Sequence, residues 1–153
     1  MEWPDPRFTV SNGTVTDTLT GLIWLQNANC ANATRNWQTA LTDVAQLNTD
    51  GTMNGDNCGD TADNTDWRLP NRYELESLLH MGCFSPALPN TLGTGCFTVG
   101  GEPFNNVVSS YYWSSTTCVG YPDLAWSVYL NDGSMGASGK AFTNYVWPVR
   151  SGQ

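Results

Sequence analysis

The stretch Asp66-Trp67-Arg68-Leu69-Pro70-Asn71-Arg72-Tyr73-Glu74-Leu75 carries the clearest local pattern in the chain. Asn71 is a favourable N-cap residue, and Glu74 follows three positions later, which is the spacing of a capping box. Leu75, Leu78 and Leu79 then supply an apolar stripe at helical spacing. The stretch therefore predicts a helix that begins after Asn71 and buries its leucine side.

A second helix is predicted upstream of this one. From residue 36 onward the pattern becomes helical, because Trp37, Leu41, Val44 and Leu47 recur at spacings of four, three and three. Between the two helices, residues 48–66 are rich in Gly, Asn and Asp and contain almost no apolar residue. This composition predicts a loop.

Strands are predicted towards both ends of the chain. Residues 8–17 have the pattern strand, Asn12-Gly13 turn, strand, and residues 21–25 form a further apolar strand. In the last third, residues 111–115, 125–130 and 145–149 are strand candidates. Two helices flanked by strands indicate an α+β fold with its terminal strands paired. No linker or repeat divides the chain, so residues 1–153 are expected to form a single domain.

The charge balance excludes several classes of partner. The chain has 6 Lys plus Arg against 14 Asp plus Glu, a formal charge of −8. A nucleic-acid reader needs a clustered basic surface, so we expect no nucleic-acid partner, and an anionic membrane or heparin-type ligand is equally disfavoured. No run of about 18 apolar residues exists, so no membrane insertion by this domain is expected. The first residues, Met1-Glu2-Trp3-Pro4, lack the basic start and apolar stretch of a signal peptide.

The five cysteines favour an oxidising compartment, because they lie in loop-like sequence rich in Gly and Asn. None forms a CxxC pair, which disfavours a zinc or thioredoxin-like site. We expect Cys83 to pair with Cys96 across a short loop and Cys30 to pair with Cys58, although the spacing alone leaves other connectivities open. Cys118 would then be unpaired. The expected location is extracellular or at the cell surface, with the leader absent from this sequence.

Several segments together resemble the Lcl C-terminal-like domain family. They are residues 13–24 (GTVTDTLTGLIW), the helix 37–47, DWRLPN at 66–71 followed by Glu74-Leu75, YWSST at 112–116, and YVWPVR at 145–150. The resemblance spans residues 8–150 in order. It implies a C-type-lectin-like fold, with two helices packed on a twisted, mostly antiparallel sheet with long loops. It also implies an extracellular role in ligand binding. The family's adhesin member is linked to sulfated polysaccharides, from which the acidic charge of this chain departs.

The last third is also similar to the variable proteins of diversity-generating retroelements, which carry a C-type-lectin-like region rewritten at template adenines. Changing the adenines of Asn codons gives only codons that end in a pyrimidine, which cannot encode Trp, Met, Lys, Glu or Gln. Residues 110–150 are therefore the predicted variable, ligand-binding region, with Trp126, Met135 and Lys140 as fixed scaffold. The predicted ligand-binding residues belong to the permitted set and look unconstrained by packing: Cys118, Val119, Gly120, Tyr121, Leu124, Ser127, Tyr129, Ser134, Gly136, Ser138, Gly139, Ala141, Phe142 and Thr143.

Strand alternation supports part of this set. Within residues 125–130, Trp126, Val128 and Leu130 share one face, and Ser127 and Tyr129 share the other. We expect the apolar trio to face the core and the other two side chains to face solvent. Among the exposed candidates, Tyr121, Tyr129 and Phe142 would give large rigid contact area, as aromatic residues do in antibody paratopes. Trp113 and Trp147 are expected in the core.

No catalytic residue is predicted. His80, the only histidine, has no nucleophile or carboxylate placed around it by a motif, and Cys118 has no base partner. Formylglycine-generating enzymes share the fold family, but their cysteine pair has no counterpart near this C-terminus. The oxygen-rich loop Asp50, Asn54, Asp56, Asp60, Asp63 and Asp66 could hold a structural calcium ion, yet it lacks EF-hand spacing. No cofactor is therefore predicted.

The sequence predicts a non-catalytic, receptor-like or adhesin-like domain that recognises a protein or glycan ligand at a surface. Two alternatives stay open at this point. One is a fixed adhesin or lectin domain whose aromatic residues stack on polysaccharide. The other is a structural module that assembles with copies of itself. The identity of the ligand and the oligomeric state are not specified by these patterns.

Overall fold

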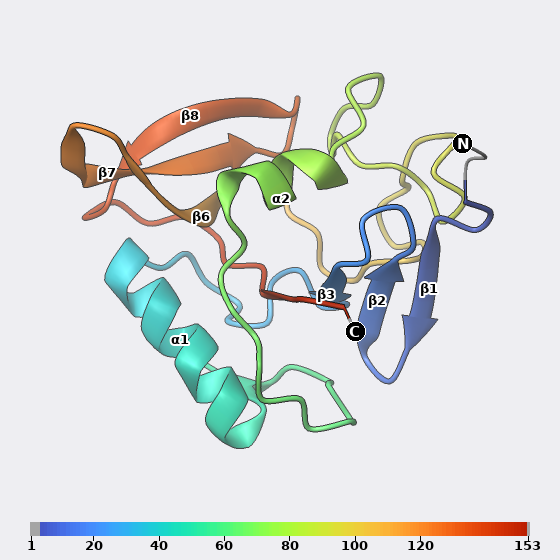
Figure 1. Ribbon diagram of the computed structural model, residues 1–153, viewed down its shortest axis with the longest axis horizontal. Coiled ribbons are helices and arrows are strands. Elements are labelled where there is room, and N and C mark those ends of the chain that lie inside the picture. Colours follow the sequence, from blue (N-terminus) through green and yellow to red (C-terminus); the bar gives the residue numbers. More distant parts are fainter. Residues whose placement is uncertain (1–3, 153) are drawn as a thin grey trace.

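The computed structural model describes residues 4–152 and has an α+β fold (Figure 1). Residues 1–3, where the signal-peptide pattern is lacking, and residue 153 lie outside the described part. The first sheet has the order β1-β2-β3-β9, and every pairing in it is antiparallel. Its strands are β1 (Phe8–Ser11), β2 (Thr14–Asp17), β3 (Ile23–Leu25) and β9 (Val149–Arg150). Strands from both ends of the chain thus meet in one sheet, as predicted.

The turn between β1 and β2 follows directly from its two residues. Asn12 has φ 54° and Gly13 has φ 77°, and two consecutive residues with positive φ are what a two-residue hairpin turn requires. Asn and Gly adopt this conformation more readily than other residues. The predicted Asn-Gly hairpin is confirmed.

A second sheet, β6-β7-β8, is an antiparallel meander in the last third of the chain. Its strands are β6 (Tyr111–Cys118), β7 (Tyr121–Tyr129) and β8 (Ser134–Gly139). The antiparallel pairing that the family resemblance implies is confirmed, but the strands divide between separate sheets instead of forming one. The segment 145–150 connects them: the backbone N–H of Tyr145 donates to Tyr111 O, and Pro148 O accepts from the N–H of Leu25. Pro148 has no N–H, which prevents a continuous ladder here.

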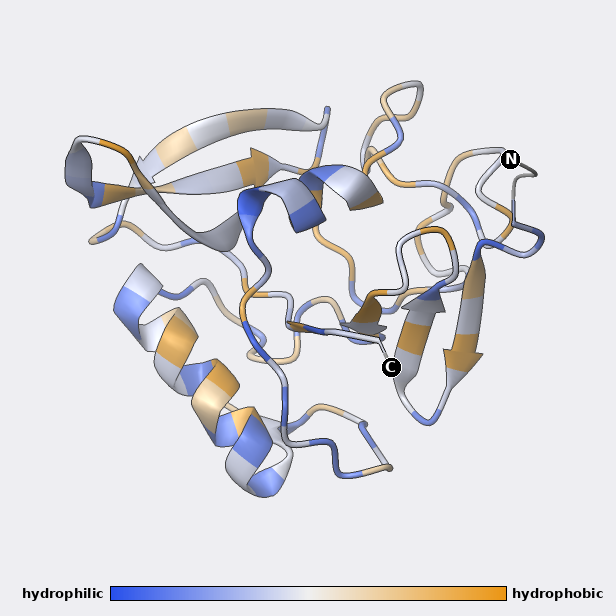
Figure 2. Cartoon of the chain, viewed as in Figure 1, coloured by the Kyte–Doolittle hydropathy of each residue, from blue (hydrophilic) through white to orange (hydrophobic). Residues whose placement is uncertain are grey.

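Both helices begin where the sequence predicts. Helix α1 (Trp37–Asp50) is capped by the side chain of Asn36, and α2 (Arg72–Leu78) begins with the complete Asn71–Glu74 capping box. Along α1, hydrophobic and hydrophilic residues alternate in bands (Figure 2). The loop prediction for 48–66 is only partly right, because α1 continues to Asp50 and two short strands follow, β4 (Thr52–Met53) and β5 (Asp56–Asn57). Gly51, with φ 77°, ends the helix and turns the chain into this hairpin.

Aromatic side chains fill the space between the two sheets. Trp147 lies at the centre, with ring centroids 4.9 Å from Phe104, 5.5 Å from Trp24 and 5.6 Å from Tyr112. Its indole Nε1 donates to Leu25 O at 2.8 Å. Trp113 and Trp147 are both buried, as predicted. One residue of the closing segment therefore packs against β3, β6 and the loop before β6.

The two predicted disulfides are present. Cys30 is bonded to Cys58 and Cys83 to Cys96, which leaves Cys118 as the free thiol. Two such bonds are typical of proteins from an oxidising compartment. Within residues 4–152, none of the helices combines the length and the apolar character needed to cross a bilayer.

Candidate ligand-binding face

The outer end of the β6-β7-β8 sheet presents exposed apolar side chains. We call this region the hairpin end; it comprises the β6–β7 turn, residues 118–121, and residues 139–143, which run from the last residue of β8 onward. Val119 is 97 % exposed, Tyr121 65 % and Phe142 73 %. Figure 1 shows the β6–β7 turn projecting at the left of the molecule. Exposed apolar groups that form a contiguous patch can serve as a contact surface.

The fourteen predicted ligand-binding residues differ widely in exposure. Seven are exposed: Val119, Gly120, Tyr121, Ser134, Ala141, Phe142 and Thr143. Five are half-buried: Leu124, Tyr129, Gly136, Ser138 and Gly139. Cys118 and Ser127 are buried, so the expectation that these two positions are free of packing constraints is wrong.

Ser127 is buried because both faces of β7 are covered. Trp113 is its partner across the β6–β7 pair, and cross-strand partners project from the same face. The indole Nε1 of Trp113 donates to Arg35 O at 2.7 Å, so the segment leading into α1 lies against this side. The Ser127 hydroxyl lies 2.9 Å from the Ser138 hydroxyl. The predicted outward orientation of Ser127 is therefore wrong, since alternation identifies the two faces but not which of them is exposed.

Trp126 also differs from its predicted core position. It is half-buried, and the guanidinium carbon of Arg72 lies 4.0 Å from its ring centroid. Val128 and Leu130, on the same face, are buried as predicted. Val128 and Leu130 are thus covered by the core, whereas Trp126 is covered by the Arg72 side chain from α2.

Predicted residues line a cavity of about 740 Å³ between the hairpin end and α1. The sheet contributes Asp123, Leu124, Gly139, Lys140 and Ala141, and the start of α1 contributes Asn36, Trp37 and Gln38. Leu124, Gly139 and Ala141 belong to the predicted set. The contribution of α1 was missed, because in the sequence Trp37 fits the buried stripe of its helix. A tryptophan directly after an N-cap residue is the only pattern that could have indicated it.

The side chains of Trp37 and Lys140 contact each other in this cavity. The Lys140 ammonium lies 4.0 Å from the Trp37 ring centroid and donates to the Thr117 hydroxyl at 2.9 Å. The Trp37 indole donates to Ser114 O at 3.0 Å. An aromatic ring and a cation are thus fixed beside the exposed residues of the hairpin end. Such a wall can make apolar and polar contacts together.

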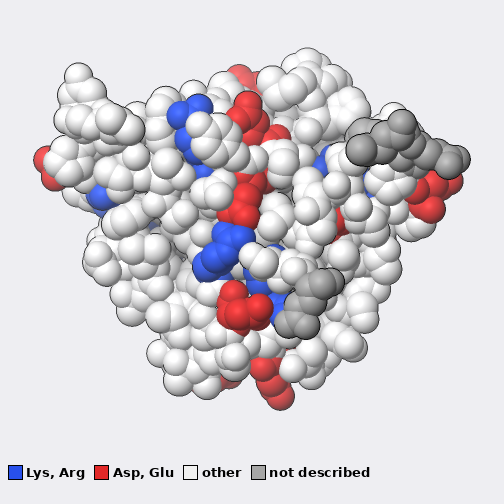
Figure 3. Space-filling model, viewed as in Figure 1, with Lys and Arg blue, Asp and Glu red and all other residues white. Residues whose placement is uncertain are grey.

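The other cations of the described chain are mostly paired. Arg7, Arg35, Arg68 and Arg150 each form an ion pair with a carboxylate, whereas Lys140 and Arg72 contact tryptophan rings. On the face shown in Figure 3, basic and acidic residues lie next to each other in a central band. Within residues 4–152 the structure therefore offers no clustered basic surface for a polyanion.

Some candidates lie away from the hairpin end. Tyr129 stacks on Tyr111 with a centroid distance of 4.5 Å, and Ser134 donates to the Asp132 carboxylate through its backbone N–H and its hydroxyl. These contacts lie at the opposite end of the β7–β8 pair, where the chain turns between the two strands. The structure thus divides the predicted set between the two ends of one sheet.

Three carboxylates of the oxygen-rich loop, those of Asp50, Asp60 and Asp66, have separate partners. Asp60 accepts from the Asn64 backbone N–H and from the Trp67 indole. A hydrogen bond from the Arg150 side chain lowers the pKa of Asp66, and hydrogen bonds from Thr52 lower that of Asp50. In the part of the chain that the structure describes, no three His, Cys, Asp or Glu side chains gather as a metal-binding group.

His80, the histidine considered in the search for a catalytic base, is half-buried and accepts from the Gly82 N–H through Nδ1.

The model of the Lcl C-terminal domain matches residues 13–150 of this chain. The chain belongs to the Lcl C-terminal domain family. As a member of this family, it has both disulfides, both helices and the whole β6-β7-β8 sheet within the matched span, and only β1 lies before it. No curated protein matches the sequence.

Proposed function

We propose that this Lcl C-terminal domain is a non-catalytic ligand-binding domain with a C-type-lectin-like fold. Its hairpin end recognises a protein or another surface molecule, and the side chains there are diversified, as in the variable protein of a diversity-generating retroelement. The two helices, the antiparallel sheets and the pairing of terminal strands support the fold proposal. The two disulfides support a location outside the cell or on its surface.

The observation that carries this proposal is the contrast in burial within one sheet. Val119, Tyr121 and Phe142, at the hairpin end, are largely exposed, whereas Trp113 on β6 and Ser127 on β7 are both 0 % exposed. The exposed side chains can change without disturbing the buried layer that fixes the backbone. Rigid strands that carry replaceable aromatic and small side chains have the composition of a paratope.

A pair of display libraries tests this proposal. The first randomises the exposed hairpin-end positions Val119, Tyr121, Ala141, Phe142 and Thr143. The matched control randomises five exposed positions elsewhere: Thr18, Leu19, Thr20, Glu76 and Met81. Both libraries are displayed on yeast, selected for protease resistance, and then sorted against a panel of immobilised globular proteins.

We expect most members of the first library to resist protease, and we expect specific binders to come from it more often than from the control. The first library alone combines replaceable exposed residues with the fixed wall formed by Trp37 and Lys140. Loss of protease resistance in most of its members, or an equal yield of binders from both libraries, would contradict the proposal.

A further inference from the structure

Strand β8 is an edge of the β6-β7-β8 sheet, and β7 is its one neighbour among the described strands. We call its outer side, formed by the backbone of residues 134–139, the β8 edge; Figure 1 shows it at the top left of the molecule. Natural proteins protect such edges with charged side chains, proline or a bulge, because unpaired backbone groups attract other strands. The sequence of β8, SMGASG, contains no charged residue and no proline, and its register with β7 is continuous. The β8 edge is therefore open to a further strand.

Pairing with β7 determines which backbone groups of β8 point outward. The Lys140 N–H donates to Asp123 O at 2.8 Å, and this pair continues the β7–β8 register. Hydrogen-bonded and non-bonded pairs alternate between antiparallel strands, so the even-numbered residues of β8 bond to β7. The N–H groups of Met135, Ala137 and Gly139 therefore point away from the sheet, as do the C=O groups of Met135 and Ala137. Within residues 4–152, these outward groups have no hydrogen-bond partner.

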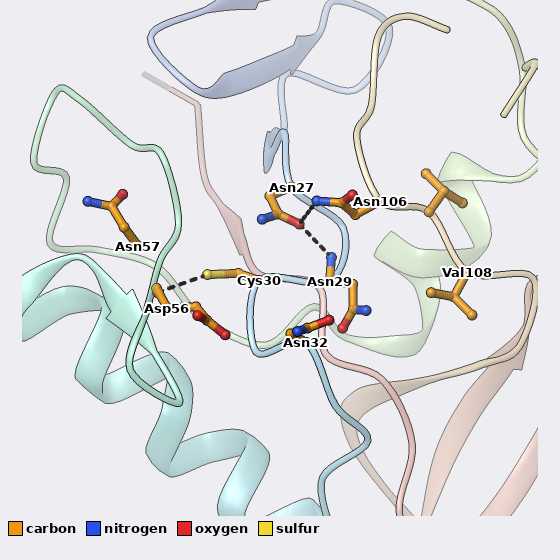
Figure 4. A pocket seen from close by; sticks show the side chains of 9 residues that line it. Asn27, Asn29, Cys30, Asn32, Asp56, Asn57, Asn106 and Val108 are labelled. Atoms are coloured by element: carbon orange, nitrogen blue, oxygen red, sulfur yellow. Dashed lines mark hydrogen bonds between the residues drawn. The ribbon is translucent and has the colours of Figure 1, made fainter. Parts of the chain in front are cut away.

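The polar groups of the cavity in Figure 4 have partners within the protein. This cavity of about 540 Å³ is lined mainly by asparagines. The Asn27 carboxamide oxygen accepts from the Asn29 backbone N–H at 3.0 Å and from Asn106 Nδ2 at 3.1 Å. The cavity shares no residue with β8, so its side-chain amides provide an internal control for binding at the β8 edge.

Two cations without an ion pair flank the β8 edge, whereas every other Lys or Arg of the described chain pairs with a carboxylate. One is Lys140, which directly follows β8. The other is Arg72, whose guanidinium lies 4.0 Å from the ring centroid of Trp126, the cross-strand partner of Ala137. Partners project from the same face, so Arg72 and Ala137 share one face of the sheet. Only Nε of this guanidinium is both buried and unpartnered, which leaves Nη1 and Nη2 accessible.

An added strand would meet one of these cations on each face. Side chains alternate along a strand, so Ala137 and Lys140, three residues apart, project to opposite faces. A strand paired with β8 lies about 4.8 Å beyond it and continues the same alternation. An acidic residue opposite Ala137 would then face Arg72, and another three positions away would face the Lys140 ammonium.

We propose that the β8 edge binds an extended, acidic segment of the protein that this domain recognises. The segment joins the sheet as a fourth strand, bonded to the outward backbone groups of Met135, Ala137 and Gly139. Its acidic side chains complement Arg72 and Lys140. The inference rests on the proposed function, because it names the class of that ligand: a protein with an exposed acidic segment in extended conformation.

Amide hydrogen exchange tests the pairing on the unaltered chain. ¹⁵N-labelled protein is titrated with a blocked eight-residue peptide of Thr and Val that carries Glu at its third and sixth positions. We expect saturable shifts and slower exchange at the outward N–H groups of Met135, Ala137 and Gly139. The even-numbered amides of β8 already bond to β7, so their exchange should change little. The asparagine side-chain resonances of the cavity in Figure 4 should not move.

Matched peptides separate the charge from the backbone. Replacing both Glu residues by Gln should weaken binding about fivefold, since each exposed charged contact contributes little, and replacing them by Lys should weaken it further. N-methylation of alternate peptide residues should abolish binding in one set and retain it in the other, because a strand pairs through one side only.

Variants of the protein locate the site. Ala137→Pro removes an outward N–H, which an edge strand tolerates, and should abolish peptide binding. Its matched control, Ala137→Ser, keeps the N–H and should bind the peptide as the unaltered chain does. Arg72→Gln should reduce the preference for Glu over Gln to about twofold. Arg150→Gln removes a cation paired with Asp66 and should leave that preference unchanged.

Three results on the unaltered chain would overturn the inference. The first is the absence of saturable protection at the outward amides, and the second is equal affinity for the Glu and Lys peptides. The third is protection that grows with protein concentration without peptide, because a second copy of the chain would then be the strand that pairs with β8. Neither display library alters β8, so enrichment of binders without peptide pairing would remove this inference alone. Peptide pairing without enrichment would contradict the proposed function alone.

Discussion

At the scale of single residues, Ser127 and Tyr121 show how differently two positions of one strand can be packed. Both lie on β7, and both belong to the set that codon chemistry allows to vary. Tyr121 is 65 % exposed at the hairpin end, whereas Ser127 is fully buried and bonded to Ser138. A large side chain is therefore tolerated at 121 but has no room at 127.

Substitutions at these two positions should separate them clearly. Ser127→Phe places a large ring in a filled space, and we expect it to lower the free energy of unfolding by about 2–3 kcal/mol. Tyr121→Ser removes an exposed ring and should change that free energy by less than about 0.5 kcal/mol. Urea unfolding measures both values. Equal stability of the two variants would show that Ser127 is not packed as described.

At the scale of elements, helix α2 depends on a carboxylate with two roles. Glu74 completes the capping box through the Asn71 N–H at 2.9 Å, and it forms a two-bond ion pair with Arg68 at 2.6 Å. Burial acts to raise the pKa of Glu74, but the hydrogen bonds from Arg68 and Asn71 outweigh it and hold that pKa below its ordinary value of 4.5. The ionised form therefore stabilises the folded state.

The variant Glu74→Gln should make this contribution visible as a pH dependence. Because the folded pKa is depressed, the contribution is complete above the unfolded value near 4.5 and is lost as the pH falls through the folded pKa. We expect the variant to be less stable by about 1 kcal/mol at pH 7, since Arg68 is partly exposed to solvent. The difference should shrink below pH 4.5. Unfolding curves at pH 7 and pH 3 with the same stability gap would refute this account of α2.

The elements that the sequence predicts well are those fixed by local chemistry. The Asn12-Gly13 turn and the Asn71–Glu74 capping box each need only a few adjacent residues, and both are present. The candidate site depends on contacts between distant segments. Nothing within β7 reveals that Trp113 and the approach to α1 cover Ser127, and nothing near Trp37 reveals that it faces Lys140. The sequence therefore predicts exposed residues of the hairpin end, but it does not predict that Trp37 and Lys140 lie beside them.

At the scale of the whole molecule, two disulfides connect segments that lie outside the helices and strands. Cys30–Cys58 closes a sequence separation of 28 residues, and Cys83–Cys96 closes one of 13 in the loop after α2. A longer closed loop restrains the unfolded chain more strongly. The first bond should therefore contribute more to stability.

Removal of each pair measures these contributions. We expect Cys30→Ala with Cys58→Ala to lower the free energy of unfolding by about 3.5 kcal/mol, and Cys83→Ala with Cys96→Ala by about 3 kcal/mol. Guanidinium unfolding at constant pH provides both numbers. As a control, Cys118→Ala leaves both bonds intact and should cost less than either pair, because it truncates one small buried side chain. A greater loss for the Cys83–Cys96 pair would contradict the loop-length argument.

The central claim is that exposed residues of the hairpin end are diversified for recognition on a fixed scaffold. The most direct measurement is to read the DNA around the gene for a near-identical repeat of its 3′ end beside a reverse transcriptase. The account predicts a repeat that differs at adenines, with the altered codons at exposed positions such as Val119, Tyr121 and Phe142 and not at Trp113 or Trp147. Absence of the repeat, or differences that fall equally on buried codons, would contradict the claim.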